Sequence, residues 1–309
     1  MLADRVPPGG APRGVAVLMT CHNRRDRTLA ALASVHAQTG LPAGTRCTVH
    51  LVDAGSSDGT ADEVRAAFPR TDVLTVGTDV HWGTGTGIAA TRADPAAHVL
   101  WLNDDVVLDP GALAALLRTA APLDRPAVAV GAMCSGDGTR TTYSGYRLVR
   151  PRLRPPVLER VEPDDRHAKP CDTCNGNAVL VTAPARRVLG DLDPAFPHRM
   201  GDHDYGLRAR SAGIPLLLAP GHVGICDDNS GAARGTSAEP GLDARTALRR
   251  LVSVREQPPA PWWRYCRRHL GPWAPLVFCS PYVKTVLRAG VRLPGAVPRH
   301  RQSSLRAEP

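Results

Sequence analysis

Short apolar runs that alternate with helical patterns constrain the fold of this 309-residue chain more than any other feature. Residues between the runs repeat their apolar positions at helical spacing. Strands that alternate with helices at this rhythm favour a mainly parallel sheet with helices on both faces. We therefore predict an α/β fold with a mainly parallel central sheet. The predicted strands are 15–19, 48–52, 72–76, 98–102, 127–132 and 177–182.

Polar side chains follow three of these strands at the point where each apolar run ends. Ligands of open α/β sheets bind outside the carboxyl ends of the strands. Paired carboxylates there can hold a divalent cation, which in turn can hold phosphates. We interpret the group as a nucleoside diphosphate site, although a loop or a helix cap also explains two adjacent acids. Its members are Thr20, His22, Asn23, Arg24, Asp53, Asn103, Asp104 and Asp105.

A glycine-rich run, GTGTG at residues 83–87, does not supply a different phosphate site. It lacks the G-x-G-x-x-G spacing and does not follow the first strand, and the chain has no P-loop motif. We expect a flexible loop over the ligand or a plain glycine-rich turn.

A second acidic cluster lies in the other half of the chain, where His198, Asp202, His203 and Asp204 occur within seven residues. Aspartate near a helix N-terminus is favoured by capping and by the helix dipole, so a purely structural role explains part of the pattern. The crowding of four titratable groups favours a site, in which one carboxylate can act as a general base.

The positive charge of the chain is concentrated at its C-terminus. From Pro258 onward there are nine basic residues and one acid, which gives 9 − 1 = +8 of the net +9. Tryptophans and other aromatic residues lie between these charges. We expect the tail to bind an anionic membrane surface, with a helical pair packed on the rest of the chain as the alternative. A confined basic tail does not favour a nucleic-acid partner.

Eight cysteines are scattered through the chain, and only Cys171 and Cys174 form a C-x-x-C pair. Reduced cytosolic thiols are the expectation, and a metal or redox site at this pair is the alternative. The sequence has no signal-peptide pattern and no apolar run of membrane-spanning length. We expect a cytoplasmic protein, held peripherally on the inner face of the cell membrane if its tail binds lipid.

The motifs in combination resemble the family 2 glycosyltransferases, which are inverting enzymes with the GT-A fold, and among them the bacterial polysaccharide and rhamnosyltransferase-like members. Two positions depart from the family pattern, because Ala54 replaces an aspartate and Gly201 replaces an acid. The segments that carry the likeness are MTCHNR at 19–24, VDAGSSDGT at 52–60, WLNDDV at 101–106, CNGN at 174–177 and GDHDYGLRA at 201–209.

The resemblance implies a role for each candidate residue. The nucleotide loop would comprise Thr20, His22, Asn23 and Arg24, with Asp53 on the base and Asp104 on the ribose. Mg²⁺ or Mn²⁺ would bind Asp105, with His222 as a further ligand. Asp202 would be the catalytic base, and the departure at Gly201 leaves Asp204 as the alternative. The residues on the acceptor side would be Asn175, Asn177 and Asp204.

The resemblance also implies the domain organisation. We expect a loose tail at 1–13, a GT-A domain at 14–235 and a basic, aromatic helical extension at 236–309. Within the GT-A domain, the donor half would span about 14–132 and the acceptor half about 133–235.

The predicted function is inverting, metal-dependent transfer of a sugar from a UDP- or dTDP-sugar to a hydroxyl of a glycan or lipid-linked acceptor, in the synthesis of bacterial surface polysaccharide or glycoconjugate. One alternative is a sugar-phosphate nucleotidyltransferase, but the first loop lacks the glycines which that class uses. Another is a non-catalytic protein that binds nucleotide sugars.

Overall fold

Parallel strands separated by helices build the first half of the structure, as the sequence predicts. The computed structural model describes residues 14–122, 124–227 and 235–290, so the predicted N-terminal tail lies outside the described residues. The elements of this half are β1 (Gly14–Cys21), α1 (Arg25–His36), β2 (Arg46–Asp53), α2 (Thr60–Ala67), β3 (Asp72–Thr75), α3 (Trp82–Arg92), β4 (His98–Leu102), β5 (Val107–Leu108), α4 (Ala112–Thr119) and β6 (Val128–Cys134).

The second half begins with short strands and ends in helices. Its elements are β7 (Thr141–Tyr143), β8 (Gly145–Val149), β9 (Val157–Arg160), β10 (Lys169–Cys171), β11 (Thr173–Cys174), β12 (Ala178–Val181), α5 (Ala183–Leu189), α6 (Gly201–Ser211), β13 (Leu216–Ile225), α7 (Ala244–Leu251), α8 (Pro259–His269), the 3-10 helix η1 (Gly271–Trp273) and α9 (Ala274–Gly290).

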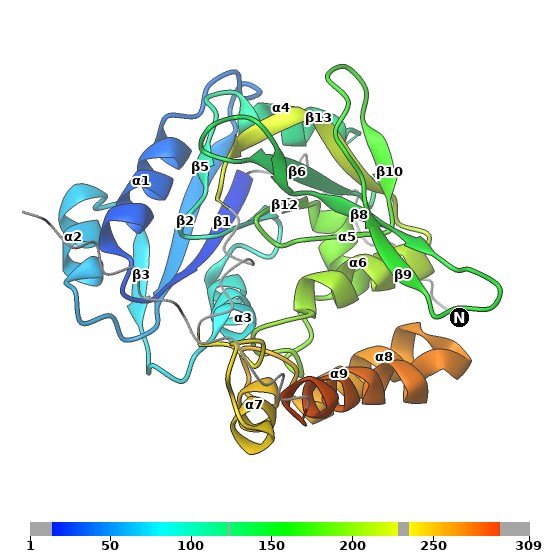
Figure 1. The fold of residues 1–309 in the computed structure, drawn as a ribbon. Helices are drawn as coiled ribbons and strands as arrows, with labels where there is room; N and C mark the ends of the chain where they lie inside the picture. Colours follow the sequence, from blue (N-terminus) through cyan, green and yellow to red (C-terminus); the bar gives the residue numbers. More distant parts are fainter. Residues whose placement is uncertain (1–13, 123, 228–234, 291–309) are drawn as a thin grey trace, which may run out of the picture.

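A central sheet in the order β10-β13-β6-β12-β4-β1-β2-β3 forms the middle layer of the molecule (Figure 1). The strands β4, β1, β2 and β3 are parallel neighbours, and β6 is parallel to β13. β12 lies antiparallel between β4 and β6, which joins the two parallel groups. The mainly parallel sheet of the sequence prediction is therefore confirmed, with an antiparallel strand at its centre.

Helices cover both faces of this sheet. On one face, Val17 of β1 belongs to a buried cluster with Leu32 of α1. On the other face, Leu18 belongs to a second cluster with Ala89 of α3 and Tyr205 of α6. Because successive side chains of a strand point to opposite sides, the uninterrupted apolar run of β1 reflects burial on both faces.

The glycine-rich run is helical, which corrects the expectation of a loop or turn. It forms the first part of α3, which packs against β1. A Cβ atom at Gly85 would lie 2.5 Å from Oγ1 of Thr20, and one at Gly83 would lie 2.3 Å from the carbonyl oxygen of Phe196. The glycines are therefore needed for close packing of the helix, and not for loop flexibility.

A small sheet in the order β11-β8-β9 and the C-terminal helices complete the structure (Figure 1). Tyr265 of α8 is buried in a cluster with Leu148 of β8, Leu207 of α6, and Phe196 from the segment before α6. The predicted C-terminal helical extension is present, and its described part packs on the α/β layers. Residues 291–309, which hold four of the basic residues of the tail, lie outside the described residues.

Candidate active site

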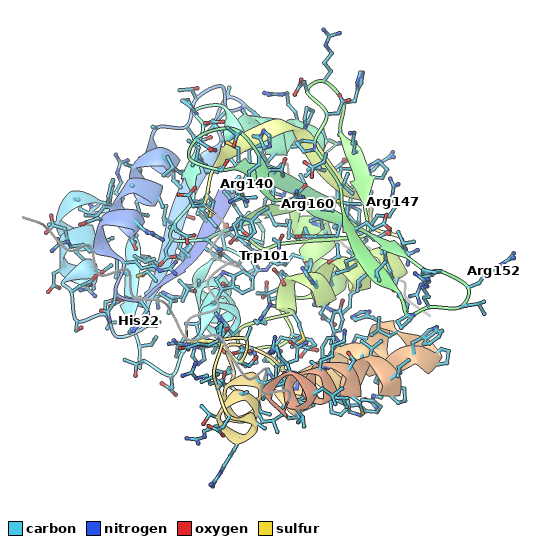
Figure 2. All side chains as sticks on the ribbon, in the orientation of Figure 1. His22, Trp101, Arg140, Arg147, Arg152 and Arg160 are labelled. Atoms are coloured by element: carbon cyan, nitrogen blue, oxygen red, sulfur yellow. The ribbon has the colours of Figure 1, made fainter. Side chains whose placement is uncertain are left out.

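The ends of β1, β2 and β4 meet at one edge of the central sheet. The register pairs Cys21 of β1 with Asp53 of β2, and Leu18 of β1 with Trp101 of β4. The loops that follow these strands are therefore neighbours, as the strand-end argument predicts. Figure 2 shows His22 at the left of the molecule and Trp101 near its centre, with Arg152 of the β8–β9 hairpin at the right.

The loop after β1 is fixed by hydrogen bonds to the loop after β2. His22 Nδ1 lies 2.8 Å from the carbonyl oxygen of Ala54, so Nδ1 carries the proton and Nε2 is left as an acceptor. Asn23 has a φ of 51°, and its Oδ1 accepts a hydrogen bond of 2.8 Å from the backbone N–H of Ser57. Asparagine tolerates this left-handed conformation better than most residues, so the sequence favours one shape for the loop.

Asp53 and Thr20 are buried at the floor of this region. Asp53 is 1% exposed, and its Oδ1 accepts a hydrogen bond from the hydroxyl of Ser56. The hydroxyl of Thr20 is buried and has no hydrogen-bond partner among the described residues. A buried hydroxyl without a partner is costly unless a ligand completes it, so Thr20 fits a ligand-binding role.

Asp104 and Asp105 share Arg24 as a cationic partner, and Arg27 lies 3.9 Å from Oδ2 of Asp105. One guanidinium nitrogen of Arg24 lies 3.1 Å from Oδ1 of Asp104 and 2.9 Å from Oδ2 of Asp105. Burial raises the pKa of Asp104 to about 6, an effect that Asp105 adds to and Arg24 opposes. The two carboxylates thus favour a positive charge at this strand end. Carboxylate oxygens are hard ligands, so a pair of them in this environment fits Mg²⁺ or Mn²⁺.

The structure does not bring His222 to this acid pair. His222 lies within β13, which continues to residue 225. Its Nε2 is 3.0 Å from the hydroxyl of Thr141. The residue of β13 that approaches the acids is near the end of the strand, where Cys226 Sγ lies 3.5 Å from Oδ1 of Asp105. His222 lies four residues before Cys226, with an irregularity of the strand between His222 and Gly224.

A cavity of about 520 Å³ lies between the sheet and the C-terminal helices. One part of its wall is polar and includes both asparagines of the CNGN motif. The other part is apolar and comes from β8, the β8–β9 loop, β9, α8 and α9. The lining residues that concern the site are Trp82, Asn103, Leu148, Leu158, Asn175, Asn177, His198, Arg199, Asp202, His203, Trp262, Tyr265, Leu270 and Val277.

Asp202 lies in the polar wall of this cavity with its carboxylate held by two backbone groups. Oδ2 accepts a hydrogen bond of 2.9 Å from the N–H of Gly176, and Oδ1 accepts one of 2.8 Å from the N–H of His203. A Cβ atom on Gly176 would lie 2.5 Å from the ring of Trp82 and 3.5 Å from Cβ of Asp202. Because Gly176 has no side chain, the indole ring of Trp82 and the carboxylate of Asp202 can both contact the backbone of this segment.

The two asparagines around Gly176 lie in the same wall. Asn175 Oδ1 accepts a hydrogen bond of 2.8 Å from the hydroxyl of Tyr146. The carbonyl oxygen of Asn177 accepts one of 3.1 Å from the N–H of Asn103. Asn103 directly precedes the acid pair, so this bond links the donor-side strand end to the CNGN segment.

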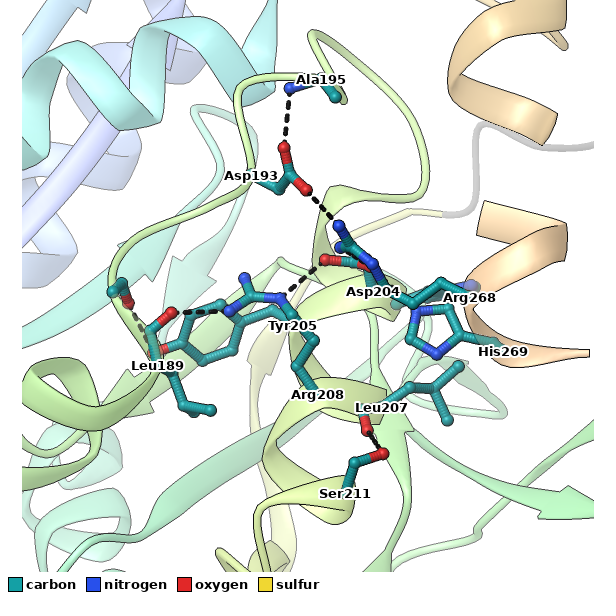
Figure 3. Close-up of polar contacts among 12 residues, drawn as sticks. Leu189, Asp193, Ala195, Asp204, Tyr205, Leu207, Arg208, Ser211, Arg268 and His269 are labelled. Atoms are coloured by element: carbon teal, nitrogen blue, oxygen red, sulfur yellow. Dashed lines mark hydrogen bonds and ion pairs between the residues drawn. The ribbon is translucent and has the colours of Figure 1, made fainter. Parts of the chain in front are cut away.

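Asp204 points away from the cavity, which corrects the expectation that it lies on the acceptor side. Its side chain is fully buried and accepts hydrogen bonds from Arg208 Nε, Arg268 and His269 Nε2, at 2.8, 2.6 and 2.8 Å (Figure 3). Burial acts to raise the pKa of Asp204, but the hydrogen bonds from His269, Arg208 and Arg268 outweigh it and hold the pKa below its usual value. Asp204 thus fastens α8 to α6.

The sequence placed His198 and Asn103 in candidate sites, but it did not indicate Trp82 and Trp262 as cavity residues. The Nδ1 atom of His198 and Oδ1 of Asn103 are buried without hydrogen-bond partners among the described residues. Burial lowers the pKa of His198 to about 4, so the ring is neutral at pH 7. Trp82 begins the glycine-rich helix, and Trp262 belongs to the basic tail. The sequence signal that could have identified Trp82 is its position directly before the small residues of the glycine-rich run.

Cys171 and Cys174 lie on β10 and β11, and both are buried. Burial raises the pKa of Cys171 to about 12 and that of Cys174 well above its usual value. Thiols in this environment are protonated at neutral pH and are poor nucleophiles.

Solved structures share this fold at low sequence identity. GalNAc-T7, solved with UDP, GalNAc and Mn²⁺, superposes with a TM-score of 0.55 at 14% identity, over 87% of this chain and 54% of that one. The present chain therefore spans about half of that protein. The mannosyltransferase PcManGT from Pyrobaculum calidifontis, solved with GDP-Man and Mn²⁺, superposes with a TM-score of 0.52 at 15% identity, over 92% and 74%. The fold is that of the GT-A glycosyltransferases.

The chain belongs to glycosyl transferase family 2, whose family model matches residues 16–180, more than half of the sequence. It is similar to the N-acetylglucosaminyl-diphospho-decaprenol L-rhamnosyltransferase of Mycobacterium tuberculosis, in strains CDC 1551 and H37Rv. The identity is 27% over 217 residues, which are 61% of this chain and 68% of the relative. The protein is therefore a glycosyltransferase, and the predicted family is confirmed.

Proposed function

We propose that this glycosyltransferase is an inverting enzyme that moves a sugar from a nucleoside diphosphate to an acceptor hydroxyl, with Asp202 as the base. One observation carries the proposal: the cavity that contains Asp202 extends to Asn103, which directly precedes Asp104 and Asp105. The wall of the cavity with the proposed acceptor groups therefore reaches the residue next to the proposed donor-side acids.

The donor would lie over the loops that follow β1, β2 and β4. Asp53 would contact the base, with Thr20, His22 and Asn23 beside it, and Asp104 would contact the ribose. Asp105, next to Asp104, would hold Mg²⁺ or Mn²⁺. When bound, this ion would neutralise the charge that builds up on the departing diphosphate. Arg24 supports the fit of this site to a cation, because its positively charged guanidinium donates hydrogen bonds to both carboxylates.

Asp202 would accept the proton of the attacking hydroxyl. Two backbone N–H groups orient its carboxylate, and its side chain is partly exposed to the cavity. Inversion requires the acceptor to attack from the face opposite the leaving diphosphate, so the base and the diphosphate site must lie on opposite sides of the sugar. The separation of Asp202 from the acid pair by Asn103 and Asn177 supports this arrangement.

The acceptor would be amphiphilic, with a sugar head and a lipid carrier. The mycobacterial relative is named for transfer of L-rhamnose to N-acetylglucosaminyl-diphospho-decaprenol. In the present chain, Arg199 lies in the polar part of the cavity wall, and Leu158, Leu270 and Val277 lie in the apolar part. An anionic linker and a hydrocarbon chain match these two parts. We place the reaction in bacterial surface polysaccharide or glycoconjugate synthesis, with a UDP- or dTDP-sugar as donor.

The C-terminal helices would bring the enzyme to a membrane surface. In residues 14–122, 124–227 and 235–290, no helix is both long and apolar enough to cross a bilayer. α9 instead exposes apolar side chains at near-helical intervals, and Lys284 and Arg288 lie among them. This pattern is typical of a helix that lies on an anionic interface. The exposed apolar residues are Leu276, Val283, Val286 and Leu287.

A thermal-shift screen of nucleoside diphosphates and their sugars with Mn²⁺ tests the donor site. A ligand at a hundred times its Kd stabilises the fold by about 2.7 kcal/mol, so the matching nucleotide is recognised by its shift. Product analysis with the matching sugar follows. Release of a nucleoside diphosphate supports the proposal, release of pyrophosphate indicates a nucleotidyltransferase, and binding without turnover on any lipid-linked acceptor indicates a non-catalytic binding protein.

A further inference from the structure

The loop that joins β8 to β9 combines two features that are rare together on a protein surface. Leu153 is 89% exposed, the highest value among the exposed large apolar residues of the described chain. Arg152 and Arg154 flank it, both are exposed, and neither pairs with an acid among the described residues. From residue 147 to residue 158 the sequence contains four arginines and no acid.

The loop is held in a defined place in spite of its exposure. Pro151, Pro155 and Pro156 restrict its backbone, because proline fixes one dihedral angle and reduces the number of unfolded conformations. Arg150 donates a hydrogen bond of 3.0 Å to the carbonyl oxygen of His269, at the end of α8. Figure 2 shows Arg152 at the tip of the hairpin, directed away from the body of the molecule.

This loop lies at the rim of the acceptor cavity. Leu148 before it, Pro156 within it and Leu158 after it line the cavity together with Trp262 of α8 and Val277 of α9. The arginines and the exposed leucine therefore lie next to the apolar wall, and Figure 2 shows Arg152 on the other side of the molecule from His22.

An anionic lipid surface matches this combination of groups. Arginine heads are attracted to negative headgroups, and a leucine between them can insert into the acyl boundary. A nucleic acid or an acidic protein would pair with the arginines but would leave Leu153 in water. We propose that the loop of residues 150–156 is a membrane-contact site that places the mouth of the acceptor cavity against an anionic bilayer. The inference rests on the proposed function, because a lipid-linked acceptor must reach the cavity from a membrane.

Sedimentation of the full-length protein with vesicles tests the loop. The vesicles contain either phosphatidylcholine alone or phosphatidylcholine with 30% phosphatidylglycerol. The test variant is Arg152→Gln/Leu153→Ser/Arg154→Gln, and the matched control is Arg187→Gln/Val188→Ser on α5, where an exposed arginine and a 61% exposed valine lie outside the acceptor cavity. We expect the test variant to bind the anionic vesicles roughly thirtyfold more weakly, since each of the two arginines near the surface contributes about fivefold. The control should bind like the wild type.

Each result has one meaning for the loop. Equal binding of the test variant and the wild type overturns the proposal, as does equal binding of the wild type to neutral and anionic vesicles. A change of oligomeric state in the test variant, measured by light scattering with vesicle binding unchanged, also overturns it and identifies a protein interface. Calorimetry with nucleoside diphosphate and Mn²⁺ is run on the same samples. A wild type that binds vesicles but no nucleotide contradicts the proposed donor site and leaves the lipid contact supported.

Discussion

Two pairs of aspartates that are close together in sequence belong to the candidate site residues, and the structure uses the two pairs differently. Asp104 and Asp105 converge on the guanidinium of Arg24 at the strand end. Asp202 and Asp204 diverge, because the first faces the cavity and the second is fully buried against α8. The comparison shows that spacing in sequence does not reveal whether two acids serve one site.

The difference follows from the local backbone. A turn follows β4, so adjacent side chains there can be directed at one cation. Asp202 and Asp204 lie two residues apart in the first turn of α6, and two residues of α-helix rotate a side chain by about 200°. The two carboxylates must therefore point to nearly opposite sides. Each contacts whatever element packs there, which is the CNGN segment for Asp202 and α8 for Asp204.

The substitution Asp202→Asn should have the largest effect on turnover, and it distinguishes the role of Asp202 from that of Asp204. We expect turnover to fall by about two to four orders of magnitude, which is the usual contribution of a general base. Nucleotide binding, measured by calorimetry with Mn²⁺, should change little, because the predicted donor contacts come from the loops after β1, β2 and β4 and not from α6. Normal turnover of this variant would remove Asp202 from the mechanism.

The substitution Asp105→Ala tests the first pair. Transfer should fall by about two to three orders of magnitude, as it does when a group that stabilises developing charge is lost. Binding of nucleoside diphosphate with Mn²⁺ should weaken as well, which distinguishes this variant from Asp202→Asn. Asp62→Ala on the surface of α2 is the control. Activity at the wild-type level in the presence of a chelator would contradict the metal role.

The substitution Asp204→Asn should mainly reduce stability, whereas Asp202→Asn should mainly reduce turnover. We expect the free energy of unfolding to fall by about 3 kcal/mol, because Arg208, Arg268 and His269 would lose their charged partner in a buried position. Urea denaturation measures this, and Asp202→Asn in the same assay should differ from wild type by less than about 0.5 kcal/mol.

The pH dependence of stability gives a second measure of Asp204. Its pKa in the folded protein is lowered from 3.8, so its contribution is complete above that pH and is lost as the pH falls through the folded value. Wild type should therefore lose stability more steeply than Asp204→Asn below about pH 4. Parallel curves would mean that the ion pairs contribute little.

The substitution Gly176→Ala tests how Asp202 is held, and we expect the smallest effect from it. The added Cβ would lie 2.5 Å from the ring of Trp82, so the indole ring or the strand must move. Overpacking of this kind costs about 1–3 kcal/mol of stability. Acceptor KM should rise more than that of the donor. An equal change in both would mean that Trp82 does not act on the acceptor side.

Much of the fold could be predicted because its signals are local. The strands of the first half are apolar runs buried on both faces, and the helices between them carry their own periodicity. The position of β12 could not be predicted, since Asn177-Ala-Val-Leu-Val-Thr182 has the same pattern whether it pairs parallel or antiparallel. The helical form of residues 83–87 was missed because glycine disfavours helix locally, while close packing on β1 requires it.

The sequence by itself determined which residues stand at the ends of strands and at the start of α6, because apolar periodicity and turn chemistry are written in neighbouring residues. It thereby determined the donor-side candidates, from Thr20 to Asp105. Only the tertiary structure decided that Asp204 binds α8, that His222 contacts Thr141 away from Asp105, and that Trp82 and Trp262 border one cavity. These pairings join residues far apart in the chain, and their energies depend on packing and burial, which no local pattern records.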